Sequence, residues 1–115
     1  MHELALSESI VHTAVRACGG DKARVVAVGI DVGVLSAVAP ATLEFCMRLV
    51  LDESGMTHTQ VRISETPAVA RCECGLDFEP GDAFAPCPQC GGFEREIVGG
   101  MDVTVRYVEV EDEEG

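Results

Sequence analysis

The chain reads Arg24-Val25-Val26-Ala27-Val28-Gly29-Ile30-Asp31-Val32 near its start, and this stretch limits the possible folds most. One face of it carries an apolar residue at every second position, which is the period of a β-strand that buries one side. The residues on that face are Val26, Val28, Ile30 and Val32. A strand of this kind needs further strands beside it and helices against its buried face, so the flanking sequence should supply both.

Two amphipathic helices flank the predicted strand. The first is expected over Glu3–Cys18, where apolar residues recur at helical spacing until a glycine pair ends the helix. The second is expected to begin at Pro40, which suits the first helical position, and to end at Gly55. Its apolar stripe consists of Leu43, Cys46, Met47, Val50 and Leu51. Each helix therefore has one face to bury against a sheet.

Two further strands are expected later in the chain. Residues 57–64 alternate, with Val61 and Ile63 pointing inward, and Pro67 ends the strand. Residues 101–110 form the last strand, in which the apolar parity slips by one position near the end. A β-bulge would explain this slip, and fraying of the strand would also explain it. The inward positions before the slip are Met101, Val103, Val105 and Tyr107, and those after it are Val108 and Val110.

Residues 68–97 differ from the rest of the chain, because they hold four of the six cysteines and lack helical periodicity. The expected fold class is α+β, with two helices packed on a three-stranded sheet and an inserted four-cysteine domain that resembles a zinc ribbon. One domain would then be discontinuous and consist of residues 1–67 plus 98–115. Residues 68–97 would form the second, metal-binding domain.

The composition limits the possible functions. The 115 residues include 20 Asp and Glu against 8 Lys and Arg, for a formal net charge of −12. Such a chain repels phosphate backbones and anionic lipids, so we expect it to bind neither nucleic acid nor membranes. It shows no membrane-spanning run and no signal-peptide pattern, which favours a cytoplasmic location. It also lacks a catalytic triad, a phosphate-binding glycine loop and a metalloprotease helix, so we expect that it is not an enzyme.

Four cysteines occur in two pairs, Cys72-Glu73-Cys74-Gly75 and Cys87-Pro88-Gln89-Cys90-Gly91-Gly92. The second pair has the spacing of a metal knuckle, in which two thiolates reach one ion and the following glycine forms the turn. The first pair has one intervening residue instead of two. Cysteines in a cytosolic chain are more often metal ligands or core residues than disulfides, so the four thiolates predict a bound metal.

A closed structural zinc site is the favoured interpretation of this quartet, because the segment has little apolar material and zinc ligation supplies folding free energy. A rubredoxin-like iron site for electron transfer is the first alternative. The second is a zinc ribbon that binds nucleic acid. No Lys or Arg lies between Cys72 and Phe93, whereas phosphate contacts require basic side chains, so the second alternative is disfavoured.

The remaining cysteines and two of the histidines have simpler interpretations. Cys18 and Cys46 lie on the apolar stripes of the two helices and are expected to be core thiols. His12 follows Glu8 by four residues, as in an exposed helical pair. His58 lies at the start of the predicted strand over residues 57–64, just after a glycine turn, and is expected at the surface.

The chain begins Met1-His2-Glu3, which brings an amine, an imidazole and a carboxylate together. The Met1 amine and the backbone and imidazole nitrogens of His2 can close chelate rings around one cation. Nitrogen-rich sets of this kind suit Ni(II) or Cu(II). A histidine beside a start methionine is usually an idle surface residue, and Glu3 also suits the first turn of a helix, so both interpretations stand at this point.

Together these features resemble the HypA/HybF family of hydrogenase maturation factors over nearly the full length of the chain. Besides Met1-His2-Glu3 and the cysteine quartet, the resemblance rests on Val32-Gly33-Val34-Leu35-Ser36, Leu43-Glu44-Phe45, Ile63-Ser64-Glu65-Thr66-Pro67-Ala68, Gly100-Met101-Asp102-Val103 and Val108-Glu109-Val110. Each segment alone is weak evidence, but the combination is specific.

The resemblance implies a nickel metallochaperone that delivers Ni(II) during maturation of nickel–iron hydrogenase. His2 would be the main nickel ligand, with Glu3 as an adjacent contributor. The Met1 amine stays a further candidate ligand from the chelate rings described above. Structural Zn(II) would be bound by Cys72, Cys74, Cys87 and Cys90. The implied partners are a hydrogenase-maturation GTPase accessory protein, the hydrogenase large subunit precursor and, in some organisms, urease accessory proteins.

Two departures from the family pattern bear on the metal sites. The Cys72-Cys74 spacing is one residue short, and Ala39-Pro40 stands where many members carry an acidic residue, with Glu44 as the nearest substitute. Two hypotheses from other classes also fit the residues. One is a rubredoxin-like electron carrier, and the other is a zinc-stapled adaptor that binds a partner without handling nickel.

Overall fold

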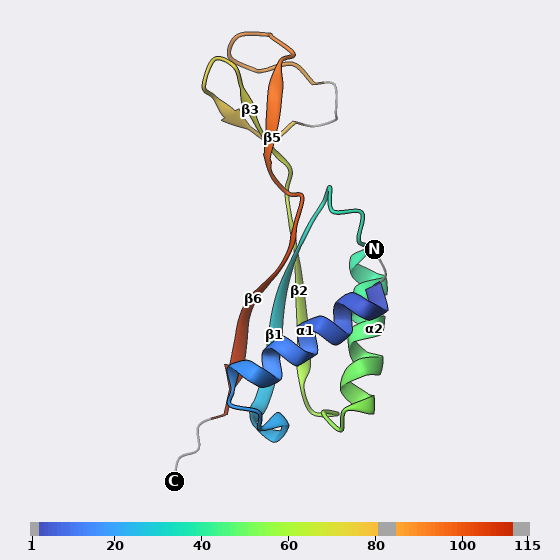
Figure 1. The fold of residues 1–115 in the computed structure, drawn as a ribbon. Coiled ribbons are helices and arrows are strands. Elements are labelled where there is room, and N and C mark those ends of the chain that lie inside the picture. Colours follow the sequence, from blue (N-terminus) through green and yellow to red (C-terminus); the bar gives the residue numbers. More distant parts are fainter. Residues whose placement is uncertain (1–2, 81–84, 112–115) are drawn as a thin grey trace.

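The structure is a computed structural model that describes residues 3–80 and 85–111. Its strands form two separate three-stranded sheets that follow one another along a molecule of 57 × 30 × 16 Å (Figure 1). The elements are α1 (Glu3–Ala17), a 3-10 helix (Lys22–Arg24), β1 (Val25–Gly33), α2 (Pro40–Glu53), β2 (Gln60–Thr66), β3 (Val69–Cys72), β4 (Asp77–Phe78), β5 (Arg95–Gly99) and β6 (Val103–Val110).

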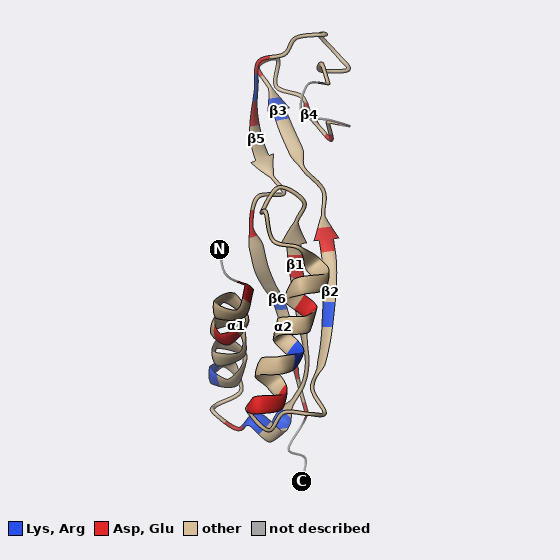
Figure 2. Ribbon diagram, turned by 90° about the vertical axis from the view of Figure 1, so that its right-hand side faces the viewer, with Lys and Arg blue, Asp and Glu red and all other residues tan. Residues whose placement is uncertain are grey.

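The larger sheet has the strand order β2-β1-β6, in which β1 is parallel to β2 and antiparallel to β6. The parallel pair is possible because α2 carries the chain back between its two strands. Both helices lie on the same face of this sheet (Figure 2). The predicted α+β fold, with two helices on a three-stranded sheet, is therefore confirmed.

The core lies between this sheet and the two helices, and it is almost entirely aliphatic. The buried Thr59 donates its hydroxyl hydrogen to the carbonyl oxygen of Val25 at 2.8 Å, so this hydroxyl is paired away from water. The buried core residues are Ile10, Val11, Ala14, Cys18, Val25, Val28, Ile30, Val32, Val38, Leu43, Met47, Val50, Leu51 and Met56.

Strand β1 differs from its prediction at one end. Val28, Ile30 and Val32 are buried as predicted, but the buried residue at the start of the strand is Val25 and not Val26, which is half-buried. The pairing with β6 shifts register between Val25 and Ala27. A bulge at this point adds one residue and reverses the side-chain alternation, so the prediction for Val26 is wrong.

A bulge in β6 explains the parity slip that the sequence shows. Gly29 pairs with Tyr107 while Ile30 pairs with Val105, so Arg106 is the extra residue. Tyr107 consequently points to the opposite face of the sheet from Val105. Its ring lies over Gly29 on the face that the helices do not cover. The inward placement of Tyr107 is therefore wrong. Met101 is also not inward, because it precedes the strand and is 49% exposed.

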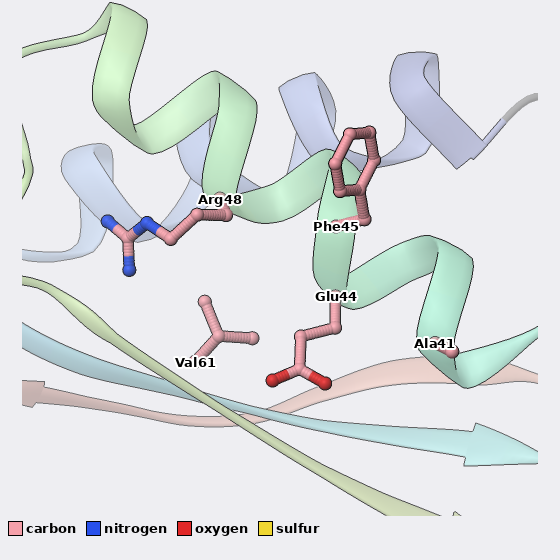
Figure 3. Close-up of a pocket in the computed structure, with 5 residues that line it drawn as sticks. All are labelled: Ala41, Glu44, Phe45, Arg48 and Val61. Atoms are coloured by element: carbon pink, nitrogen blue, oxygen red, sulfur yellow. The ribbon is translucent and has the colours of Figure 1, made fainter.

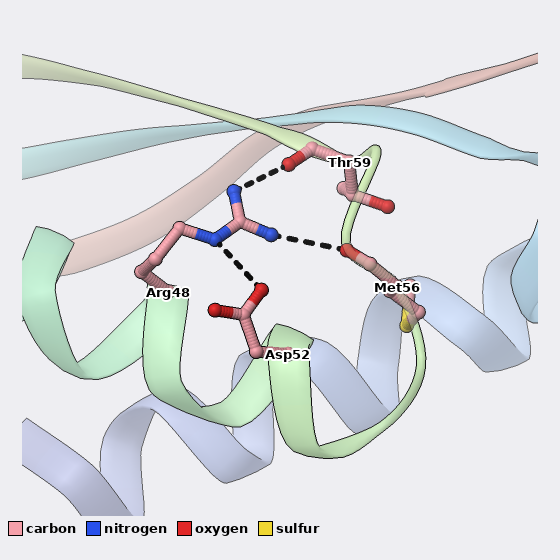
Figure 4. A network of polar contacts seen from close by, with 4 residues as sticks. All are labelled: Arg48, Asp52, Met56 and Thr59. Atoms are coloured by element: carbon pink, nitrogen blue, oxygen red, sulfur yellow. Dashed lines mark hydrogen bonds and ion pairs between the residues drawn. The ribbon is translucent and has the colours of Figure 1, made fainter.

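Strand β2 begins at Gln60, three residues later than predicted, because the residues before it form a turn that Arg48 holds (Figure 4). The Arg48 guanidinium donates to the carbonyl oxygens of Met56 at 3.0 Å and Thr59 at 2.8 Å. It also donates to the carboxylate of Asp52, one helical turn away, at 3.2 Å. All three contacts fix the exit of α2 and the entry of β2.

The smaller sheet lies between β2 and β6 in the sequence and has the order β4-β3-β5. Its strand β5 extends to Gly99. Two chain crossings connect it to the larger sheet, one after β2 and one before β6 (Figure 1).

Backbone hydrogen bonds tie the end of β1 to both crossings. The N–H of Gly33 donates to Asp102 at 2.9 Å, the N–H of Val34 to Thr66 at 3.0 Å, and the N–H of Leu35 to Gly100 at 2.7 Å. A Cβ atom on Gly33 would lie 2.3 Å from the Gly100 oxygen, so only glycine permits this approach. We call the residues joined by these three hydrogen bonds the junction.

Across the described ranges, 3–80 and 85–111, no helix is long and apolar enough to cross a membrane.

Candidate metal centres

The four cysteines of the two pairs converge in the smaller sheet. Cys72 ends β3, Cys74 lies in the turn toward β4, and Cys87 and Cys90 lie in the loop before β5. Their sulfur atoms all lie within 4.8 Å of one another. The Cys72 and Cys90 sulfurs are 3.4 Å apart, and those of Cys74 and Cys87 are 3.8 Å apart. The one-residue spacing of the first pair therefore still brings both of its sulfurs to the cluster.

Each cysteine pair is followed by a glycine that closes a turn. The N–H of Gly75 donates to the carbonyl of Cys72 at 2.8 Å, and the N–H of Gly91 donates to that of Cys87 at 2.9 Å. Both glycines have positive φ, 99° and 73° respectively, which non-glycine residues rarely adopt. These turns aim sulfurs from both halves of the segment at one point.

Backbone N–H groups also point at the sulfurs. The N–H of Gln89 lies 3.4 Å from the Cys87 sulfur, and that of Gly92 lies 3.4 Å from the Cys90 sulfur. Hydrogen bonds to sulfur favour the thiolate, because they stabilise its negative charge. The loop therefore provides part of the environment that four thiolate ligands require.

The thiol pKa values show how crowded the cluster is. The N–H of Cys90 lowers the pKa of Cys87 most; although burial opposes this, further hydrogen bonds bring the pKa to about 6. At Cys72 the N–H of Cys74 also lowers the pKa, but burial and the neighbouring thiols outweigh it and raise the pKa to about 12. Four thiolates this close repel one another unless a cation lies between them.

The donor set therefore fits a divalent metal. Four sulfur ligands with no open position are typical of structural zinc, and iron takes the same set. Within the part of the chain that the structure describes, no other group of three or more His, Cys, Asp or Glu side chains is close enough to hold a metal ion.

The second predicted site lies mostly outside the described residues, because Met1 and His2 precede residue 3. Glu3 is half-buried and is the first residue of α1, where its carbonyl accepts a hydrogen bond from the Ser7 hydroxyl at 2.8 Å. Its carboxylate lies in the first helical turn, a position that the helix dipole favours for negative charge.

The first turns of α1 face the junction. A groove there is lined by Leu6 of α1, by Ser36 and Val38 of the loop after β1, and by Asp102 of the crossing before β6. The sequence did not single out Asp102, which lines this groove beside the N-terminal helix. Only the antiparallel return of β6 brings it there. Glu44, the substitute that the sequence suggested, lines a different groove beside β2.

The other cysteines and histidines lie apart from both predicted sites. Cys18 is buried, as predicted, and its thiol lies 3.2 Å from the carbonyl oxygens of Val15 and Asp21. Cys46 is only half-buried, because it lies at the border of the α2 apolar stripe, so its prediction as a core thiol is wrong. His12 and His58 are exposed, as predicted.

Comparison with known proteins also identifies a class of metal-handling proteins. The chain matches, over residues 1–110, the family model described as "Hydrogenase/urease nickel incorporation, metallochaperone, hypA". Hydrogenase maturation factor HypA of Geotalea uraniireducens is 33% identical over 112 residues, covering 96% of this chain and 100% of that protein. Hydrogenase maturation factor HypA 2 of Bradyrhizobium diazoefficiens is 35% identical over 113 residues, with 96% and 100% covered.

Solved structures share the fold. The solution structure of the Ni metallochaperone HypA from Helicobacter pylori has a TM-score of 0.68 at 18% identity and covers 98% of this chain and 100% of its own. A second solution structure of a HypA protein has a TM-score of 0.72 at 18% identity, with 96% of each chain covered. Two linked sheets with a four-cysteine cluster thus define a small metal-binding protein. The chain belongs to the HypA family of hydrogenase maturation metallochaperones.

Proposed function

We propose that this protein is a nickel carrier, which binds Ni(II) at Met1-His2-Glu3 and delivers it during maturation of nickel–iron hydrogenase. The observation that carries this proposal is the family match over residues 1–110, which includes both predicted metal sites. In this role Ni(II) is cargo, so its site should release the ion readily. The protein would then act by binding and transfer and not by catalysis.

His2 is the main nickel ligand in this proposal, with Glu3 and the Met1 amine beside it. Support comes from the position of Glu3 at the very start of α1, next to the groove that Leu6 and Asp102 line. A metal held ahead of the first helical turn would lie at the surface, where a partner could take it. The proposed partners are a GTPase accessory protein of hydrogenase maturation, the precursor of the hydrogenase large subunit and, where urease is present, urease accessory proteins.

Zn(II) is the proposed resident metal of the cysteine cluster. Cys72, Cys74, Cys87 and Cys90 would hold it, and the ion would supply charge neutralisation and cross-linking for a sheet with few buried apolar side chains. The cluster also fits iron, so its metal has to be measured. Colourless protein with one zinc per chain would support the zinc assignment. Iron with a reversible redox wave would support a rubredoxin-like electron carrier instead.

Nickel titration of protein whose first residue is Met1 tests the cargo site. Wild-type protein should bind about one Ni(II) per chain by calorimetry, and His2→Ala should lose most of that affinity. His12→Ala is the matched control, because it removes an exposed histidine from α1 and should bind like wild type. Equal affinity in wild type and His2→Ala would refute the proposed ligand. If the affinity for a partner protein changed neither with nickel nor in His2→Ala, the zinc-stapled adaptor would be favoured instead.

The same titration has a predictable pH dependence. Binding requires the neutral imidazole of His2, so affinity should fall as the pH drops through the ordinary histidine pKa of about 6.5. An added N-terminal extension should also weaken binding, because it removes the α-amine of Met1. Nickel affinity unchanged by the extension would show that the amine is not a ligand.

A further inference from the structure

The larger sheet has two outer edges, and they differ in regularity. Strand β6 pairs with β1 through two register shifts. Such bulges twist an edge strand and hinder pairing with another chain. Strand β2 instead pairs with β1 in unbroken register from Gln60 to Thr66. The β2 edge is therefore the better template for an added strand.

The hydrogen-bonding groups on this edge can be assigned from one contact. The N–H of Val34 donates to the carbonyl of Thr66 at 3.0 Å, so Thr66 turns its backbone groups toward β1. Successive residues of a strand point these groups in opposite directions. The N–H and C=O groups of Val61, Ile63 and Glu65 therefore face away from β1, toward the open edge.

Helix α2 overhangs the same edge. A groove of about 360 Å³ lies between the helix and the strand, and its lining includes Phe45 from α2 and Val61 from β2 (Figure 3). Phe45 is 65% exposed, which is unusual for a side chain of this size and apolarity. A strand added to β2 would lie beside the helix and cover Val61, whereas the ring of Phe45 points away from β2 (Figure 3).

The charge left in the groove is negative. The carboxylate of Glu44 points toward β2 (Figure 3), and within the described ranges it takes part in no ion pair. Arg48 also lines the groove, but its guanidinium is already bonded to Asp52, Met56 and Thr59. Glu65 is exposed and, four residues after Val61, points to the same side of β2. Two carboxylates therefore flank the apolar floor.

We propose that the β2 edge and the groove under α2 dock an extended segment of a partner protein, which adds a strand to β2 and places apolar and basic side chains in the groove. Adding a strand to an open edge is a common mode of peptide recognition, in which main-chain hydrogen bonds give affinity and side-chain pockets give selectivity. A second copy of this chain is a poor occupant, because two chains of net charge −12 repel each other.

This docking surface shares no residue with Met1-His2-Glu3 or with the cysteine cluster. A test of it therefore succeeds or fails independently of the nickel titration. The partner could reach it while both metal sites are filled.

The probe is a ten-residue synthetic peptide in which threonine alternates with valine and lysine, so that valine and lysine share one face. Backbone amide signals of the full-length protein are followed by NMR as the peptide is added to about 1 mM. Shifts should concentrate on β2 and on residues 41–48 of α2. A matched peptide with glutamate in place of lysine should bind more weakly, and one with N-methylated alternate amides along the pairing edge should not bind.

Three protein variants separate the two parts of the proposal. Glu65→Pro removes an outward-facing donor without touching the ladder to β1, and should weaken binding roughly three- to tenfold relative to Glu65→Ala, which keeps the donor. Glu44→Gln should weaken binding of the lysine peptide about two- to fivefold and leave the glutamate peptide no weaker. Nickel binding should be the same in all three variants.

Several outcomes would overturn the proposal. One is the absence of shifts on β2 when the peptide is added. Another is that the N-methylated peptide binds as tightly as the unmethylated one. Both tests use wild-type protein, so they do not depend on how any variant folds. Equal binding by Glu65→Pro and Glu65→Ala would refute the proposal that the partner adds a strand to β2. Equal binding of the lysine and glutamate peptides would refute the proposal that the groove selects basic side chains. Self-association of the free protein through β2 would identify a second copy as the occupant instead.

Discussion

The two sheets of this molecule are held together in different ways. The larger sheet and its helices bury a continuous aliphatic core that includes Leu43, Met47 and Leu51, each with no exposed surface. In the smaller sheet, the described residues include only three buried apolar side chains, those of Ala70, Cys72 and Cys87. Cys72 and Cys87 are also candidate metal ligands. Burial of apolar surface therefore stabilises one region, whereas the other needs a cross-link.

Size explains why we expect the smaller sheet to depend on such a cross-link. A segment of about 30 residues cannot bury enough apolar surface to offset the conformational entropy lost on folding. The larger unit does so because two helices cover one face of its sheet. The two regions should therefore respond differently to metal removal and to core substitutions.

Cys87→Ser should have the largest effect. The variant replaces a proposed ligand that is 2% exposed and leaves three sulfurs. If the cluster holds zinc as proposed, it should forfeit much of the ~10–16 kcal/mol that a structural zinc contributes. Strands β3, β4 and β5 should lose their protection from hydrogen exchange, while β1, α1 and α2 keep theirs. Removing metal from wild type with a chelator should give the same pattern.

Cys46→Ser is the control for that prediction, because Cys46 is half-buried and outside the cluster. It should keep one metal per chain and an exchange pattern like wild type. If Cys87→Ser unfolded both sheets together, the cysteine cluster would have to stabilise the whole molecule, and the contrast between the regions would be lost.

Much of this contrast could be predicted from the sequence. The helices follow from their periodic apolar stripes, from Pro40 at the start of α2 and from Gly55 after its end. The cysteine cluster follows from the Cys87–Cys90 spacing, because two thiolates at i and i+3 reach one ion. Such signals are local, so a single sequence carries them.

The missed features depend on contacts between distant strands. The burial of Val25 in place of Val26 results from a register shift against β6, which alternation within β1 cannot reveal. The position of Asp102 near α1, and of Glu44 beside β2, likewise depends on how the sheet is assembled. For the candidate nickel site, residue types could be predicted from the sequence, but the side chains from distant segments that lie near the start of α1 could not.

Leu43→Ala should have the next largest effect, on the larger unit. Leu43 has no exposed surface, so truncation leaves a cavity and should lower the free energy of unfolding by about 2–5 kcal/mol. Urea unfolding of the metal-loaded protein measures this value. Leu49→Ala is the control on the same helix, because Leu49 is 44% exposed and should change stability by less than about 1 kcal/mol.

Metal content adds a second measurement for Leu43→Ala. The folded variant should keep one metal per chain, because its defect lies outside the smaller sheet. A loss of metal in conditions where α1 and α2 remain folded would show that the two regions are coupled more tightly than their separate sources of stability imply.

Gly33→Ala tests the junction between the regions. The new methyl group would meet the backbone of Gly100, which cannot move without shifting the crossing to the smaller sheet, so we expect a loss of about 1–3 kcal/mol. Gly29→Ala is the matched comparison in the same strand. Its methyl group would meet the ring of Tyr107, which lies at the surface and can rotate away.

The NMR signals distinguish the two glycine variants. Gly33→Ala should shift amide signals on both sides of the junction, from β1 to residues 66–69 and 99–103. Gly29→Ala should change only β1 and the neighbouring part of β6. A larger loss of stability in Gly29→Ala than in Gly33→Ala would contradict the close approach at the junction.

The smallest expected effect concerns an ion pair inside the smaller sheet. The Arg71 guanidinium donates to both oxygens of Asp77, at 2.8 and 3.1 Å, and these hydrogen bonds lower the pKa of Asp77 below its usual value. A carboxylate with a lowered pKa stabilises the fold above its unfolded pKa, and this contribution is lost as the pH falls through the folded pKa. Because both side chains are exposed, solvent and salt should make the contribution small.

NMR titration of the Asp77 carboxyl carbon in metal-loaded protein measures this pKa, and Arg71→Gln should raise it toward the ordinary aspartate value. The metal must stay bound over the titrated range, because protonation of the thiolates at low pH also releases metal and would unfold the same sheet. If the pKa of Asp77 is the same in Arg71→Gln as in wild type, this ion pair does not measurably stabilise the smaller sheet. The proposed metal cluster would then be its main source of stability.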